Sequence, residues 1–139
     1  QPPYSLVKPE VAEEILPYCL ANNIGVIVYS PMYSGMLTGA MTRERIAAFP
    51  DDDWRKTDDE FMEPRLTRNL ALADLLVQIG KKHGRSAGEV AVAWTLRNPA
   101  VTGAIVGARR PSQVDGFIGA AAFAIPEEDL QQLDAFLKQ

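Results

Sequence analysis

The sequence has little of several things that mark whole classes of protein. It has one cysteine and one histidine among its 139 residues, so no internal disulfide can form and no set of residues has metal-ligand spacing. It contains no apolar run long enough to cross a bilayer, and its formal net charge of −4 gives no basic stripe for nucleic acid. We therefore expect no disulfide, no metal, no membrane span and no nucleic-acid partner, and we expect a cytoplasmic protein with a reduced Cys19.

Two common phosphate-binding signatures are also absent, namely GxGxxG and the lysine-containing Walker loop. What stands out instead is GVIVYSPMYSGMLTGA at residues 25–40. A short buried strand, Val26–Tyr29, is followed by a loop of small residues, which suits an oxyanion, and Tyr29 at the strand end offers a ring for stacking. Taken alone, this stretch is more typical of a buried strand followed by an ordinary turn, because loops rich in glycine and serine are common.

Hydrophobic spacing predicts helices around these loops. Pro9 begins one, with Val11, Ile15, Tyr18 and Cys19 as its buried stripe. Residues 66–83 form a strong amphipathic helix, with His83 at its positive end, and the capping box Ser86–Glu89 starts another helix that runs to about Arg97. A last helix opens at Pro126 and docks through its leucines.

Residues 41–64 are the least regular part of the chain. A short helix capped by Thr42 precedes an acidic turn and a polar stretch. Connections this long often cover a binding site, and a solvated surface insertion is an equal alternative. Trp54, Phe61 and Met62 favour the covering segment slightly, because they give it apolar groups to bury.

A second candidate site follows a second buried strand, at residues 102–106. Arg109 and Arg110 come directly after it and lead into a helix expected from Pro111, with Val114, Ile118 and Ala121 facing inward. Guanidinium groups beside a helix N-terminus favour a phosphate. The alternative is a solvated surface pair.

The element order is therefore βαβ-like, which predicts an α/β fold with parallel strands. A small doubly wound sheet and part of a (β/α)8 TIM barrel both fit. The barrel is favoured, because both candidate anion sites lie at strand C-terminal ends, its functional face. A whole barrel needs roughly 250 residues, so we expect a C-terminal partial barrel of about three strands with flanking helices.

At this point the chain resembles the aldo-keto reductases, NADP-dependent (β/α)8 oxidoreductases. The matching motifs are QPPYSL at residues 1–6, GVIVYSPM at 25–32 followed by SGMLTG at 34–39, and IVGARRPSQVD at 105–115. In this order and spacing they are specific in combination. The resemblance implies that residues 1–139 form the C-terminal, NADP-binding half of such an enzyme, with 41–64 as its cofactor-covering loop.

The resemblance also implies roles for single residues. Gln1 would hold the nicotinamide carboxamide and Tyr29 would stack on the nicotinamide. Arg109 would bind the 2′-phosphate that separates NADP from NAD, with Gly107 and Gln113 near the same end. The pyrophosphate would lie along the loop after the first strand, at Ser30, Met32, Gly35 and Thr38.

Some positions depart from the family's pattern. The family often has a lysine where Ala40 stands and Glu-Asn where Gly116 and Phe117 stand, so the phosphate and adenine contacts differ here. The family's catalytic Asp, Tyr, Lys and His come from the first half of the barrel, and we assign no catalytic residue.

The expected function is hydride transfer between NADPH and a small aldehyde or ketone, completed by the missing N-terminal half or a second copy of the chain. Two alternatives remain open. One is a cofactor-binding regulatory module resembling potassium-channel β subunits, and the other is a truncated, inactive fragment.

Overall fold

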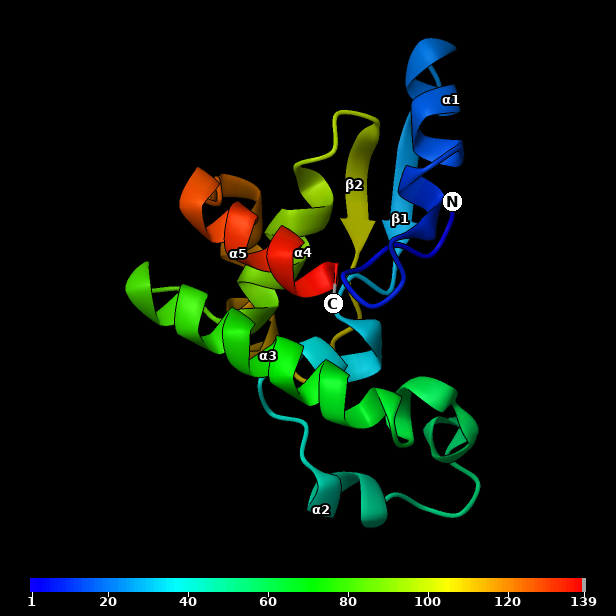
Figure 1. Cartoon of the computed structure of the whole chain (residues 1–139), viewed down its shortest axis with the longest axis vertical. Coiled ribbons are helices and arrows are strands. Elements are labelled where there is room, and N and C mark those ends of the chain that lie inside the picture. The colour runs from blue at the N-terminus through cyan, green and yellow to red at the C-terminus, as the bar shows by residue number, and fades with distance from the viewer. Residues whose placement is uncertain (139) are drawn as a thin grey trace.

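The computed structural model describes residues 1–138 as an α/β fold with a two-stranded parallel sheet (Figure 1). The strands are β1 (Val26–Tyr29) and β2 (Val101–Ile105), and Tyr29 lies opposite Ile105. Parallel strands need a crossover connection, and their C-terminal ends meet at one edge of the sheet. The loops that follow β1 and β2 therefore start next to each other, as the sequence predicted.

The N-terminal segment forms less strand than expected. Pro3 makes only an isolated bridge with Tyr29, so residues 1–138 contain two strands and one bridge where about three strands were predicted. The Tyr29 N–H donates to the carbonyl of Pro2, and Tyr29 accepts from the Tyr4 N–H, both at 3.1 Å. Pro2 and Pro3 have no N–H groups of their own, which prevents a longer ladder.

The described residues form five α-helices: α1 (Ile15–Ala21), α2 (Arg43–Ala47), α3 (Arg65–Lys82), α4 (Ala87–Leu96) and α5 (Glu127–Leu137). Local signals predicted most of them well. The capping box of α4 is present, with Ser86 accepting from the Glu89 N–H at 2.9 Å and Glu89 from the Ser86 N–H at 2.8 Å. Thr42 caps α2 as predicted. None of the helices described over residues 1–138 has the length and hydropathy to cross a bilayer.

The core lies around α4, which packs against both α3 and β2 (Figure 1). Every residue of α4 from Ala87 to Thr95 is buried, including Trp94. This helix is therefore enclosed on all sides. The long α3 contributes its predicted stripe, and α5 docks through the fully buried Leu133.

One predicted stripe is right only in part and another is wrong. In the first, Val11 and Cys19 pack against the core as predicted. Ile15 and Tyr18 are instead 49% and 65% exposed while Leu16 is fully buried, because a separate 3-10 turn at Glu10–Ala12 precedes α1 and shifts its register. After β2, Val114, Ile118 and Ala121 are exposed. Residues Pro111–Gly116 form a 3-10 helix, whose three-residue turn places different side chains inward.

Candidate functional site

A groove of about 1160 Å³ lies at the C-terminal edge of the sheet. Three segments of the chain line most of it. The β1 loop comprises residues 30–40, the β2 loop comprises residues 106–117, and the covering segment comprises residues 41–64. Eight of the nine residues predicted to bind the cofactor line this groove: Tyr29, Ser30, Met32, Gly35, Thr38, Gly107, Arg109 and Gln113. Gln1, the ninth, is exposed and does not line it.

The floor of the groove is formed by the ends of the two strands. Tyr29 is 41% exposed and its strand partner Ile105 is 44% exposed. The backbone of Tyr29 is held on both sides, by β2 and by the bridge to Pro3. This leaves an aromatic ring and an aliphatic side chain next to each other on a fixed backbone, which suits the face of a planar ligand ring.

The β1 loop has an unusual backbone. Ser30, Tyr33 and Ser34 adopt φ values of 54°, 43° and 51°, and Gly35 and Gly39 adopt 93° and 74°. Non-glycine residues seldom enter this left-handed region, so three of them in one loop mark a conformation that its surroundings impose. Sequence reasoning missed this, because only the glycines signal it.

Part of this loop's hydrogen-bonding capacity is already used. The N–H groups of Tyr33, Gly35 and Leu37 donate to carbonyls inside the loop, at 2.9, 3.2 and 3.1 Å. The Thr38 hydroxyl donates to the Gly35 carbonyl at 2.7 Å. The loop is thus a tightly bonded turn, and the bare N–H groups expected from its composition are fewer than its sequence suggests.

The β2 loop is built around Gln113. Its side-chain oxygen accepts from the N–H groups of Arg109 and Arg110, at 2.7 and 3.0 Å. Gln113 therefore shapes the backbone that carries Arg109, whose side chain is exposed at the groove. The expected α-helix dipole behind the arginines is absent, because the following helix is a six-residue 3-10 helix.

The two loops approach each other over the first turn of α4. The Ser86 hydroxyl donates to the Gly116 carbonyl at 2.6 Å, which attaches the β2 loop to the helix. A Cβ at Gly88 would lie 3.0 Å from that same carbonyl and 3.0 Å from the sulfur of Met32 in the β1 loop. Because Gly88 has no side chain, both loops can pack against the first turn of α4. The sequence pattern indicated only the capping box at this position and not this close packing.

The covering segment contributes a half-buried ion pair. The Arg55 guanidinium donates to both carboxylate oxygens of Asp53, at 2.9 and 2.6 Å, and lies 3.8 Å above the Phe49 ring. The hydrogen bond from Arg55 lowers the pKa of Asp53 to about 2, and the positive charge of Arg109 contributes to the shift. Of the apolar groups expected to anchor the segment, Phe61 is buried, whereas Trp54 is 56% and Met62 39% exposed.

The single histidine of the sequence does not line this groove. His83 lies at the end of α3, where its Nε2 is 2.6 Å from the buried carboxylate of Asp129, far along the chain from the loops. Within residues 1–138 no three His, Cys, Asp or Glu side chains are close enough together to hold a metal ion. The groove therefore presents the exposed Arg109 guanidinium and the Tyr29 ring as groups that can contact a ligand.

Known proteins resemble this chain closely. The profile of the Aldo/keto reductase family matches residues 1–138. The chain is 34% identical over 139 residues to "Aldo-keto reductase YhdN" of Bacillus subtilis, covering 99% of this chain and 41% of the relative. It is 29% identical over 130 residues to "Probable aldo-keto reductase 1" of Glycine max, covering 94% of this chain and 37% of that protein.

A solved structure agrees in fold and in extent. The glycerol dehydrogenase AKR11B4 from Gluconobacter oxydans superposes with a TM-score of 0.89 and 34% sequence identity, covering 99% of this chain and 41% of that one. The chain thus spans well under half the length of the proteins it matches. The family profile, the relatives and the solved structure agree, and the chain belongs to the aldo/keto reductase family of oxidoreductases.

Proposed function

We propose that the groove binds NADP(H) and that the chain corresponds to the C-terminal, cofactor-binding half of an aldo-keto reductase barrel. The observation that carries this proposal is the convergence of two loops from adjacent parallel strands on one groove, with Arg109 exposed in one loop and Tyr29 at the base of the other. Brought together, these groups match the charged and planar parts of a dinucleotide.

The proposed binding mode follows the groove from the strand ends outward. The nicotinamide stacks on Tyr29, with Gln1 as the proposed partner of its carboxamide. The pyrophosphate follows the β1 loop along Ser30, Met32, Gly35 and Thr38. The 2′-phosphate lies at Arg109, beside Gly107 and Gln113, and residues 41–64 cover the bound cofactor.

The proposed reaction is hydride transfer between the nicotinamide and the carbonyl carbon of an aldehyde or ketone. Reduction also needs a proton donor at the carbonyl oxygen, and we assign none in this chain. We therefore expect the 139-residue chain to bind the cofactor and to reduce no carbonyl substrate by itself. Measurable turnover by the purified chain would contradict this division of roles.

The test of cofactor binding is titration of the chain with NADPH and NADH, followed by nicotinamide fluorescence. Arg109→Ala should weaken NADPH binding about 30-fold, because a charge-assisted phosphate contact is lost, and should leave NADH binding unchanged. Arg110→Ala is the matched control, since Arg110 is also exposed and does not line the groove. Equal affinity for the two dinucleotides, or the same loss in both variants, would overturn the proposal.

A further inference from the structure

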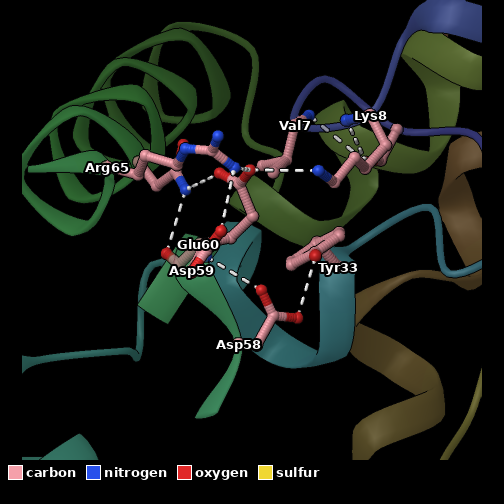
Figure 2. A network of polar contacts seen from close by, with 9 residues as sticks. Val7, Lys8, Tyr33, Asp58, Asp59, Glu60 and Arg65 are labelled. Atoms are coloured by element: carbon pink, nitrogen blue, oxygen red, sulfur yellow. Dashed lines mark hydrogen bonds and ion pairs between the residues drawn. The ribbon is translucent and has the colours of Figure 1, made fainter. Parts of the chain in front are cut away.

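A polar network behind the groove has no part in the proposed cofactor contacts. Its centre is Glu60, whose side chain is 10% exposed. The carboxylate accepts from Lys8 at 3.1 Å and from Arg65 at 2.8 Å (Figure 2). It also accepts from Asn69 at 2.8 Å. Lys8 belongs to the N-terminal segment, while Arg65 and Asn69 belong to α3. Glu60 therefore fixes the end of the covering segment to two other parts of the fold.

The direction of the pKa shift of Glu60 indicates that its carboxylate is ionised and hydrogen-bonded. Burial would raise its pKa, but hydrogen bonds from Asn69 and Lys8, with the positive charge of Lys8, outweigh burial and leave the pKa below its ordinary value. A carboxylate that stays ionised keeps all three partners at neutral pH. The anchor is therefore present under the conditions in which a cofactor would bind.

The same network reaches the β1 loop through Asp58. One Asp58 oxygen accepts from the Tyr33 hydroxyl at 2.9 Å, and the other accepts from the Glu60 N–H at 2.8 Å (Figure 2). The Tyr33 ring also stacks on Phe61, with centroids 6.1 Å apart. Tyr33 stands between Met32 and Ser34, which line the groove. Asp58 thus holds the β1 loop from the side away from the ligand space.

A second link joins the same two segments. Arg55 donates to the carbonyl of Ser34 at 3.3 Å, while Asp53 and the Phe49 ring fix its guanidinium. Tyr33 and Ser34 are also neighbouring residues with left-handed backbone. Such residues persist only where surrounding contacts hold them, and both of these contacts come from the covering segment.

We infer that Tyr33, Asp58 and Glu60 are positioning residues that lock the β1 loop and residues 54–64 of the covering segment into one unit. The inference rests on the proposed function for its consequence, which is that this unit sets the shape of the pyrophosphate wall before any cofactor binds. In Figure 1 α2 stands apart from the body of the molecule, and the residues around it reach the unit through Arg43, which donates to Glu63 at 2.7 Å, and through the Phe49 ring beneath Arg55. The wall is therefore preformed in the ligand-free chain.

Tyr33→Phe tests this, because it removes the hydroxyl and keeps the ring on Phe61. In the ligand-free chain, amide hydrogen exchange should speed up about fivefold across residues 53–61, the segment opposite the changed residue. NADPH should also bind about fivefold more weakly through faster dissociation, measured well below the unfolding temperature. Tyr18→Phe is the matched control, since Tyr18 is 65% exposed on α1 and should change neither quantity.

Glu60→Gln provides the reciprocal measurement. It weakens the anchor at the other end of the network, so exchange should speed up across residues 30–39 as well as around Glu60 itself. If each variant alters exchange only in its own segment, or if NADPH dissociation from Tyr33→Phe equals that of the parent chain, the inference is wrong. If the parent chain binds no NADPH, the proposed function fails, while the exchange measurements still decide whether the two segments form one unit.

Discussion

The two loops that line the groove start side by side on adjacent strands and are held in opposite ways. The β1 loop is a dense turn with left-handed residues, held by Asp58 from outside the groove and by Arg55, which lines the groove. The β2 loop is exposed almost throughout and depends on the Gln113 side chain and one bond from Ser86. The β1 loop is therefore a wall of the groove that is continuous with the folded core. The β2 loop is a surface segment that carries the charged side chain of Arg109.

The largest expected difference between the loops is in how much a glycine-to-alanine substitution lowers the free energy of unfolding. Gly39, in the β1 loop, has φ of 74°, and a Cβ there would lie 2.5 Å from a methyl of Val77. Gly39→Ala should therefore lower the free energy of unfolding by about 2 kcal/mol. Gly107→Ala, in the β2 loop, meets nothing within 4 Å and should change stability by less than about 0.5 kcal/mol.

Urea unfolding of the two alanine variants and the parent chain measures this contrast. Equal losses in both variants would mean that the β2 loop is as rigidly built as the β1 loop. If neither variant loses stability, the β1 loop can relax around an added side chain. That result would contradict the inference that the β1 loop is a preformed wall.

A smaller effect should separate affinity from stability in the β2 loop. Gln113→Ala removes the acceptor of the Arg109 and Arg110 N–H groups, so the backbone that carries Arg109 loses its shape. We expect NADPH to bind about fivefold more weakly, with a change in unfolding free energy below about 0.5 kcal/mol. Gln131→Ala, an exposed change on α5, is the control for both titration and urea unfolding.

The smallest effect concerns the covering segment and pH. Asp53 has its pKa lowered to about 2 from 3.8, first by the hydrogen bond from Arg55. A lowered carboxylate pKa means that the pair stabilises the fold above the ordinary pKa and loses this contribution as the pH falls through about 2. The ion pair should therefore be intact throughout neutral and mildly acidic solution and give no pH dependence to cofactor binding there.

Carboxyl carbon chemical shifts of Asp53 measure this directly. The titration midpoint should lie at about 2 in the parent chain and rise in Arg55→Gln, which lacks the guanidinium. A midpoint near the ordinary value of 3.8 in the parent chain would show that Arg55 is not held against Asp53 in solution.

Sequence reasoning found the features that depend on neighbours in the chain. β1, β2, the α3 stripe and the capping box of α4 were all indicated by local pattern, and the strand-end position of Arg109 and Tyr29 followed from parallel topology. The prediction of a third strand was wrong because two prolines remove the donors of a ladder. The α1 stripe was wrong at Ile15 and Tyr18 because a separate 3-10 turn shifts the register of the helix.

What the sequence did not show depends on contacts between distant residues. Lys8 and Glu60 are 52 positions apart, and no spacing rule connects them. The left-handed backbone of Tyr33 and Ser34 is imposed by partners in the covering segment, and the close approach at Gly88 involves two other loops. These are tertiary effects, which override what a residue type prefers by itself.

The exposure of the β2 loop has a consequence for how such a protein can change over generations. Under the proposed binding mode, a substitution at Arg109 alters an exposed surface side chain, so the choice of dinucleotide can change without unfolding the chain. A substitution in the β1 loop instead lowers the stability of the fold, so it is removed by selection before it can alter ligand preference. Variation in ligand preference among descendants of this chain should therefore accumulate at residues 107–117, while residues 30–40 keep a nearly fixed pattern.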